Sequence, residues 1–371
     1  MDDRPTEAVI RLGAIRANLA EARERSGGRE VIAVVKAEAY GHGAVPVARA
    51  LVAAGCRRLA VATVAEGCAL RAAGLAAPIL VLGGAQDAPA LAREARLTPV
   101  VHHLGHVERL RARGRVEAPL EVQVEIDTGM RRMGAPPEQA VALLEAVVRE
   151  PSLHLEGLYT HLARADERDL APSLEQAARL RVLLAEARAR GIDPGLVHCA
   201  NSAGILAGAA LRDALPEAGA VRPGLMLYGV SPAPWLAASL RPAMALRTRV
   251  VHLRAVREGE PVGYAALYRA PRATHIATLA AGYADGVPVS ASGRGSALIG
   301  GRRHPFAGRV SMDYVCVEVG DAPVALGDEA LLFGESAQGR LPVEAAAEAA
   351  GTLAYELLVR VGSRVPRVYE E

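Results

Sequence analysis

Short apolar segments alternate with longer amphipathic patterns from about residue 10 to residue 230, and this alternation constrains the fold more than any other feature. Buried parallel strands have short apolar runs, and the helices that connect them carry apolar residues on one face. We expect strands at residues 31–35, 59–62, 79–82, 99–101, 120–126, 153–159, 196–199 and 219–221. Helical patterns fill most gaps, for example 45–54, 138–148 and 174–188, and residues 63–66 read as a capping box. Eight strand–helix repeats predict a TIM-like (β/α)8 barrel over residues 10–234.

The pattern changes after the Ser-Pro-Ala-Pro segment at residues 231–234, which we interpret as a linker. Beyond it, alternating apolar and polar residues separated by turn residues are typical of strands. Segments 245–256, 274–279, 308–319 and 329–333 have this character. We therefore predict a mostly β C-terminal domain over residues 235–371, with residues 1–9 packing with it.

The composition excludes several classes of partner. Hydrophobic residues make up 51% of the chain, and the formal net charge of +2 gives no strong field for nucleic acid or a membrane surface. No signal peptide is recognisable, and no apolar run approaches the roughly 20 residues that span a bilayer. The four cysteines form no CxxC pair, so we expect thiols in a reducing compartment and a cytoplasmic location.

Lysine occurs only once in this sequence. Lys36 is the single lysine among 43 lysines and arginines, and it follows the first apolar segment. Arginine can replace lysine at most surface positions, but not where an amine must lose its proton and attack a carbonyl. The residue composition therefore indicates that Lys36 has a chemical role, and the alternative at this point is compositional drift that spared a single lysine.

Polar residues follow several of the predicted barrel strands. In a (β/α)8 barrel the reactive groups lie at the carboxyl ends of the strands, so these residues are expected to meet. They are Lys36, Asp127, His161, His198, Asn201, Ser202 and Arg222. His102, His103 and His106 also lie close together in sequence, but no matching carboxylate or thiolate set accompanies them, and we predict no metal site.

Ordered motifs along the whole chain resemble those of alanine racemases. The segment VVKAEAYGHG at 34–43 resembles the family's cofactor-lysine motif. Further matches are DTGM at 127–130, GLYTH at 157–161, HCANSA at 198–203, VRPG at 221–224 with YG at 228–229, GY at 263–264, AGYADG at 281–286, SMD at 311–313 and SRVP at 363–366. The resemblance implies a barrel that binds pyridoxal phosphate (PLP), followed by a β domain, and interconversion of L- and D-alanine.

The resemblance implies two proton carriers. Lys36 would hold PLP as a Schiff base and exchange the substrate α-proton on one face, and Tyr264 would act on the other. Two carriers are needed, because a single group on one face returns the proton with retention. An ordinary tyrosine has a pKa near 10, so we expect a local partner to lower that of Tyr264.

The resemblance also assigns cofactor-binding residues. Arg222 would face the pyridine nitrogen, and because a guanidinium only donates, that nitrogen would stay unprotonated, which limits side reactions of the carbanion. His161 would pack near the ring, and the alternative is a hydrogen-bonded core histidine. The phosphate would be bound by Tyr40, Asn201, Ser202, Gly224, Leu225 and Tyr355. For Asn201 and Ser202, a helix N-cap alone remains an alternative.

The remaining implied residues surround the substrate. Arg132 and the Met312 amide would bind its carboxylate. Tyr268 and Tyr283 would line the active-site entrance, and Asp313 belongs to the Ser-Met-Asp motif that supports it. The tyrosine base comes from a second subunit in the family, so a homodimer with a shared site is implied.

Several positions depart from the family pattern. Glu125 stands where many members carry a carbamylated lysine, and we predict that its negative charge orients Arg132 directly or through a water. An inert glutamate that faces the solvent is the alternative. Glu38, Arg131 and Ser311 also differ from the residues common in the family, which leaves a broader racemase, for example of serine, as an alternative.

Two further alternatives concern the reaction class. A non-catalytic PLP-binding protein would need no second base, so Tyr264 argues against it. A decarboxylase on the same barrel would place an acidic partner at the ring nitrogen, so Arg222 argues against that.

The expected role of alanine racemisation is the supply of D-alanine as a cell-wall precursor.

Overall fold

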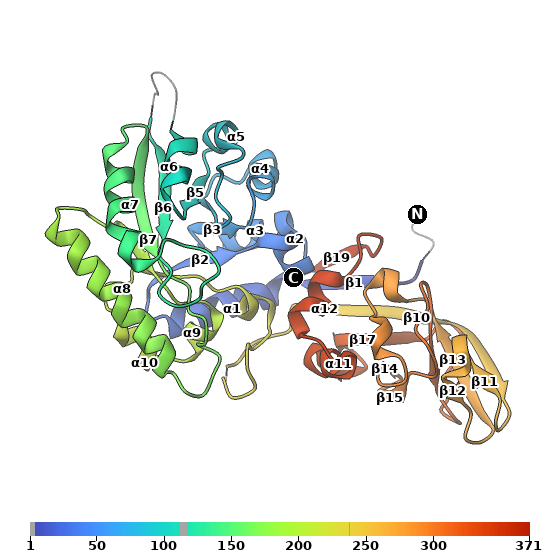
Figure 1. The fold of residues 1–371 in the computed structure, drawn as a ribbon. Helices are drawn as coiled ribbons and strands as arrows, with labels where there is room; N and C mark the ends of the chain where they lie inside the picture. Colours follow the sequence, from blue (N-terminus) through green and yellow to red (C-terminus); the bar gives the residue numbers. More distant parts are fainter. Residues whose placement is uncertain (1–3, 112–117, 237) are drawn as a thin grey trace. The chain divides into compact units, whose positions relative to one another are not determined.

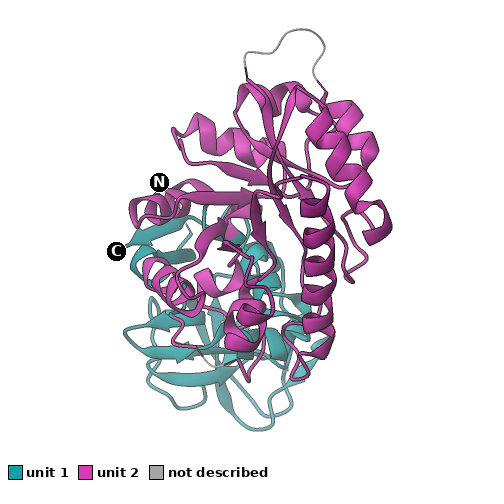
Figure 2. Cartoon of the chain, turned by 90° about the vertical axis from the view of Figure 1, so that its left-hand side faces the viewer, with its two compact units in different colours: residues 1–14, 40–43, 241–371 teal, residues 15–39, 44–240 magenta. Residues whose placement is uncertain are grey.

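The computed structural model describes residues 4–111, 118–236 and 238–371. The chain forms two compact units, shown in teal and magenta in Figure 2. Unit 1 comprises residues 1–14, 40–43 and 241–371, and unit 2 comprises residues 15–39 and 44–240. This division lies six residues beyond the expected boundary at 234 and assigns the short segment 40–43 to unit 1.

Unit 2 is a closed parallel barrel of eight strands, which confirms the predicted fold class. The strands are β2 (Glu30–Val34), β3 (Arg58–Val61), β4 (Ile79–Val81), β5 (Thr98–Val101), β6 (Leu120–Glu125), β7 (Leu153–Tyr159), β8 (Leu196–His198) and β9 (Ala220–Val221). Each strand pairs with its neighbour in sequence, and β2 pairs with β9 to close the barrel. Their residues are almost all buried, because helices cover the outer face and side chains fill the interior.

Helices follow most of the barrel strands and surround them (Figure 1). They are α1 (Leu12–Arg25), α2 (Lys36–Gly41), α3 (Ala44–Ala53), α4 (Val64–Ala72), α5 (Pro89–Glu94), α6 (Leu104–Leu110), α7 (Pro137–Arg149), α8 (Ala171–Ala189), α9 (Ser202–Leu206), α10 (Ala209–Ala214) and the 3₁₀ turn η1 (Leu225–Tyr228). The predicted capping box is present at α4, where Thr63 accepts from the Glu66 amide and Glu66 accepts from the Thr63 amide. No helix within the described residues is both long enough and apolar enough to cross a bilayer.

Unit 1 is built on a nine-stranded sheet, so the predicted β domain is confirmed. Its strands are β1 (Glu7–Arg11), β10 (Met244–Val256), β13 (Thr274–Leu279), β14 (Ser296–Ile299), β15 (Arg302–Pro305), β16 (Val315–Glu318), β17 (Glu329–Ser336), β18 (Gly339–Leu341) and β19 (Arg367–Glu370). The hairpin of β11 (Pro261–Val262) and β12 (Tyr268–Arg269) forms a separate small sheet. The other elements are η2 (Tyr264–Ala266), η3 (Tyr283–Asp285), η4 (Val289–Ala291), α11 (Val343–Ala350) and α12 (Ala354–Arg360).

The two ends of the chain meet in this sheet. Strand β1 pairs antiparallel with β10 on one side and parallel with β19 on the other. Val9 is buried in the apolar cluster that includes Ala245 and Leu331. The N-terminal strand is therefore an integral part of unit 1.

One strand expectation is wrong in part. The alternating pattern predicts a continuous strand over residues 308–319, but only Val315–Glu318 forms β16. Gly308 has a φ of +95°, and Ser311 Oγ accepts from the Tyr314 amide at 3.0 Å, so the chain turns instead of extending. This turn carries Met312 and Asp313.

Candidate active site

Lys36 lies at the carboxyl end of β2, where a barrel places its reactive groups. It begins α2, whose four following residues Ala37, Glu38, Ala39 and Tyr40 all have φ between +51° and +54°. This is a left-handed turn made of residues other than glycine, and each such residue costs roughly 1–2 kcal/mol. Strain of this kind persists only where surrounding contacts enforce it.

Glu66 supplies one of the contacts that hold this turn. Its Oε1 accepts from the Ala37 amide at 2.8 Å. Its Oε2 accepts from the amides of Ala62 at 2.7 Å and Thr63 at 3.1 Å. The capping glutamate of α4 therefore also fixes the backbone directly after Lys36.

Positive charge gathers around the Lys36 amine. Burial lowers the pKa of Lys36, the Arg132 guanidinium lowers it further, and the Glu66 carboxylate opposes this effect. Arg222 contributes in the same direction as Arg132. A larger fraction of the amine is thus neutral near physiological pH than for an exposed lysine, which is the form that attacks a carbonyl or accepts a proton.

Arg222 lies directly after β9 and is buried in the barrel. Its Nη1 donates to His198 Nδ1, and its Nη2 donates to the Thr160 carbonyl at 2.9 Å. Its guanidinium carbon lies 4.4 Å from the Tyr159 ring centroid. The guanidinium is therefore fixed in place, and it can only donate to a ligand beside it.

A chain of polar groups continues from Arg222 through the barrel interior. His198 Nε2 lies 2.8 Å from Gln123 Oε1, and Gln123 Nε2 donates to Glu156. Because Arg222 must donate to His198 Nδ1, the proton of the neutral imidazole is on Nε2 and is donated to Gln123. Burial, followed by the Arg222 charge, lowers the pKa of His198 far below its ordinary value, which keeps the ring neutral.

His161 follows β7 and lies beside Arg222. Its Nδ1 is 3.3 Å from Arg222 Nη2, and its Nε2 is 3.4 Å from Asn201 Nδ2. Burial and then the Arg222 charge lower the pKa of His161 to about 3, with smaller contributions from Arg132 and Lys36. His161 is therefore a neutral ring among cations, placed where a planar ligand next to Arg222 would meet it.

Ser202 and the segment after Arg222 form a group of donors. Ser202 Oγ accepts from the Gly224 amide at 2.9 Å and from the Met226 amide at 3.3 Å. The Leu225 amide is the first of η1 and has no acceptor within that turn. Asn201 caps α9 by accepting from the Gly204 amide at 3.0 Å, so its capping role is present. Because Ser202 Oγ accepts from two amides, its own proton can be donated to a ligand, and together with the Leu225 amide it can supply donors to a phosphate.

Arg132 lies in the loop after β6. Asp127 Oδ1 accepts from the amides of Gly129 at 2.9 Å and Arg131 at 3.0 Å, which folds this loop tightly and leaves Arg131 and Arg132 exposed. Because Arg132 acts electrostatically on Lys36 and His161, its guanidinium and the amine belong to one site.

Glu125 is buried and contacts other residues than expected. Tyr159 donates its hydroxyl to Glu125 Oε2 at 3.0 Å, and His102 Nε2 lies 3.2 Å from the same oxygen. The described part of the chain shows no hydrogen bond or ion pair between Glu125 and Arg132. The inert, solvent-facing glutamate is thus wrong, and orientation of Arg132 by Glu125 stays a prediction.

The other predicted site residues belong to unit 1. Tyr264 lies in the β11–β12 hairpin and is 70% exposed. It is held by a turn in which Gly263, Ala265 and Ala266 all have positive φ. Tyr268 follows on β12, where burial and the Glu318 carboxylate raise its pKa to about 12. Within unit 1, the hairpin therefore holds the Tyr264 side chain in an exposed position.

Tyr40 and Tyr355 lie near each other within unit 1. Burial, followed by the nearby Tyr355, raises the pKa of Tyr40 to about 12, so its hydroxyl stays protonated and can donate to an anion. The segment 40–43 is packed against α12, since a Cβ added at Gly41 would lie 2.2 Å from the Leu358 carbonyl oxygen. The two tyrosines expected at the phosphate therefore come together from distant parts of the sequence.

Sequence reasoning missed the supporting residues of this site. The sequence pattern identifies Gln123 and Glu156 only as positions within barrel strands, and Glu66 only as a capping residue. The sequence does contain one signal for Gln123, because it is a polar residue at an inward position of the apolar strand β6. Glu66 carried no signal for its second role, because that role depends on the position of another loop.

The fold and this cluster define a TIM-barrel enzyme with a reactive amine at the carboxyl ends of its strands. Residues 10–232 match the family model "Alanine racemase, N-terminal domain", and residues 243–369 match "Alanine racemase, C-terminal domain". An alanine racemase of Desulforamulus reducens is 42% identical over 376 residues, covering 98% of this chain and 99% of that protein. One of Carboxydothermus hydrogenoformans is 41% identical and covers 99% of this chain and 100% of that protein.

Solved structures agree with these matches. The alanine racemase of Streptomyces lavendulae superposes with a TM-score of 0.94 at 37% identity, covering 100% of this chain and 98% of that chain. That of Streptomyces coelicolor gives a TM-score of 0.90 at 40% identity, covering 99% and 98%. The chain belongs to the alanine racemase family, which confirms the resemblance found in its motifs.

Proposed function

We propose that this protein interconverts L- and D-alanine with pyridoxal phosphate as cofactor. The observation that carries the proposal is the single lysine of the chain, which lies at the barrel mouth with a lowered pKa next to Arg132 and Arg222. Full-length similarity to alanine racemases supports alanine as the substrate.

The residues present fit pyridoxal phosphate. An aldehyde needs a neutral amine, which burial favours at Lys36. A phosphate needs several donors, and the Ser202 hydroxyl and the Leu225 amide can provide two of them. The Gly224 amide, which donates to Ser202 Oγ, holds that hydroxyl in place. Arg222 would lie at the pyridine nitrogen and His161 against the ring, while Tyr40 and Tyr355 are proposed to add donors to the phosphate.

When bound, this cofactor supplies the electron sink that makes the substrate α-proton acidic. The chain's own residues move that proton. Lys36 accepts or donates it on one face through Nζ, and we propose that the Tyr264 hydroxyl does so on the other. Arg222 cannot give up a proton, so it limits how much charge the ring accepts and thereby favours return of the proton to Cα.

Substrate binding is assigned to groups that recognise a carboxylate. Arg132 is exposed and electrostatically linked to Lys36, so it can receive the substrate carboxylate close to the amine. The Met312 amide is proposed as a second donor. Arg131 beside Arg132 and Ser311 beside Met312 would then influence which side chain the substrate carries.

The first experiment follows the α-proton directly. The PLP-loaded protein is incubated in D₂O with single L-amino acids, the loss of the α-proton is followed by NMR, and the enantiomers are separated by chiral chromatography. We expect alanine to exchange fastest and D-alanine to carry deuterium at Cα. Faster exchange of another amino acid would overturn the assignment of alanine, and no exchange with any amino acid would overturn racemisation.

We also propose a homodimer in which Tyr264 of one subunit serves the Lys36 site of the other. Its exposure on a hairpin supports this arrangement. Inactive Lys36→Met and Tyr264→Phe variants can be unfolded together and refolded as a mixture. A shared site predicts recovery of about a quarter of the wild-type activity, because half of the dimers are mixed and each has one intact site. No recovery would contradict a shared site.

The cellular setting is proposed on chemical grounds. All four cysteines are unpaired, which supports a reducing compartment, and we propose the cytoplasm. D-alanine formed there would serve as a cell-wall precursor. Fractionation of the native host, together with growth of a deletion strain with and without D-alanine, tests both statements.

A further inference from the structure

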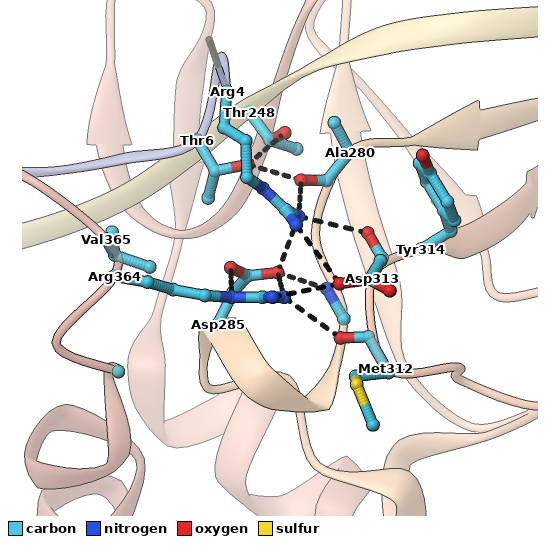
Figure 3. Close-up of polar contacts among 12 residues, drawn as sticks. Arg4, Thr6, Thr248, Ala280, Asp285, Met312, Asp313, Tyr314, Arg364 and Val365 are labelled. Carbon is cyan, nitrogen blue, oxygen red and sulfur yellow. Dashed lines mark hydrogen bonds and ion pairs between the residues drawn. The ribbon is translucent and has the colours of Figure 1, made fainter. Parts of the chain in front are cut away.

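Two arginines and two aspartates form a compact cluster in unit 1 (Figure 3). Arg4 precedes β1, Arg364 follows α12, Asp285 ends η3, and Asp313 lies in the turn before β16. Arg4 contacts Asp285 at 3.0 Å and Asp313 at 3.2 Å. Arg364 contacts Asp285 at 2.7 Å and Asp313 at 2.9 Å. We call these four residues the Arg4 cluster.

Burial explains why the cluster holds two arginines. The Asp285 side chain is only 1% exposed, and a buried carboxylate is costly unless charged and hydrogen-bonding partners surround it. One oxygen also accepts from the Gly282 amide at 2.8 Å. Asp313 is more exposed, and its hydrogen bonds to Arg364 and then Arg4 lower its pKa, so it stays ionised.

The same arginines hold backbone carbonyls. Arg4 Nη2 donates to the carbonyls of Ala280 at 2.8 Å and Asp313 at 3.2 Å. Arg364 Nη2 donates to the Met312 carbonyl at 3.2 Å. The cluster therefore fixes the main chain of the turn that carries Met312 as well as two side chains.

The turn at Met312 is also held against η3 and the Gly282 residue that precedes it. The amides of Tyr283 and Ala284 donate to the carbonyls of Ser311 at 2.9 Å and Met312 at 3.1 Å. A Cβ added at Gly282 would lie 2.4 Å from the Ser311 and Met312 carbonyl oxygens, so the two segments approach too closely for any other residue. Tyr283 and Met312 remain 44% and 51% exposed, respectively. These contacts therefore hold the backbone of two residues whose side chains remain exposed.

We infer that Arg4 is a positioning residue for the substrate site, acting from the N-terminal segment through Asp285 and Asp313 on the Met312 turn. The inference rests on the proposed function, in which the Met312 amide binds the substrate carboxylate. Arg364 contacts the same two aspartates, so loss of Arg4 leaves Asp285 paired and the fold intact. The expected effect is a displaced or more mobile Met312 amide.

The test compares Arg4→Gln and Arg4→Lys with a control in the same unit. Arg340→Gln removes an exposed arginine whose ion pair with Glu335 spans 3.3 Å and lies outside the cluster. We expect Arg4→Gln to raise the KM for alanine roughly tenfold while kcat stays within about twofold, because a binding contact is weakened. Arg4→Lys keeps the charge but fewer donors, so its KM should be intermediate. Arg340→Gln should leave both constants unchanged.

Hydrogen exchange gives a readout that does not depend on activity. In Arg4→Gln, amides of residues 282–285 and 311–314 should exchange faster than in Arg340→Gln, with other segments unchanged. An unchanged KM, or a fall in kcat that follows a general loss of stability, would overturn the inference, as would unchanged exchange. If the wild-type protein racemised no amino acid, the proposed function would be refuted. Amide hydrogen exchange would still decide whether Arg4 orders the Met312 turn.

Discussion

The Arg222 guanidinium donates to Nδ1 of His198, and this single contact determines which nitrogen of the imidazole carries the proton. A guanidinium has no lone pair to offer, so Nδ1 must accept and Nε2 must carry the proton. That proton is directed at Gln123 Oε1, 2.8 Å away. The orientation of the group proposed to face the pyridine nitrogen therefore depends on a glutamine inside the barrel.

The first prediction concerns Gln123. Replacing it with leucine leaves the Nε2–H of His198 buried without an acceptor, and Gln123 Nε2 no longer donates to Glu156. We expect Gln123→Leu to lower the free energy of unfolding by about 1–3 kcal/mol, measured by urea denaturation. Gln139→Leu, at an exposed position of α7, is the control and should stay within about 0.5 kcal/mol. Equal losses of unfolding free energy in the two variants would show that the His198–Gln123 contact does not stabilise the fold.

The second prediction concerns the Lys36 amine. Burial and the Arg132 charge lower its pKa, so in PLP-free protein the amine should react with trinitrobenzenesulfonate at lower pH than an exposed lysine. Because Lys36 is the only lysine, the Lys36→Met variant measures the α-amino background. Arg132→Ala should raise the pKa of Lys36. Arg149→Ala removes a side chain that is 75% exposed, and it should leave the pKa of Lys36 unchanged. A pKa at or above that of free lysine would contradict the proposed electrostatics.

The barrel could be predicted from the sequence because its strands are short, apolar and separated by helical patterns. Lys36 could be identified because no other lysine competes with it. The left-handed turn at 37–40 could not, since its four residues carry no glycine and are enforced by tertiary contacts such as that of Glu66. The turn at Ser311 was hidden for a similar reason, because its residues alternate like a strand while the Arg4 cluster holds them in another conformation.

The third prediction follows from that left-handed turn. Ala37 has a φ of 52° and is exposed, so glycine in its place relieves strain of roughly 1–2 kcal/mol and costs about 0.5–1 kcal/mol in unfolded-state entropy. Ala37→Gly should therefore be neutral or stabilising by up to about 1.5 kcal/mol. Ala178→Gly, at an exposed position inside α8, should destabilise by about 0.5–1 kcal/mol. Thermal and urea unfolding measure both, and a destabilised Ala37→Gly would show that the turn is not strained.

The fourth prediction concerns pH and stability. The pKa of His161 is lowered to about 3 in the folded protein, whereas an unfolded histidine titrates near 6.5. Between these values the unfolded chain binds a proton at this position that the folded protein does not, so stability falls as pH decreases from about 6.5 toward 3. His161→Gln removes that proton and should reduce the slope of unfolding free energy against pH by on the order of 1 kcal/mol per unit.

The measurement is urea denaturation of PLP-free protein at several values from pH 4.5 to 7.5. His198 also has a lowered pKa, so part of the acid sensitivity should remain in His161→Gln. His252→Gln is the control, because His252 is exposed on β10, and it should leave the slope unchanged. Parallel curves of unfolding free energy against pH for the wild type and His161→Gln would mean that His161 is protonated in the folded protein. The assignment of a neutral His161 ring beside Arg222 would then be wrong.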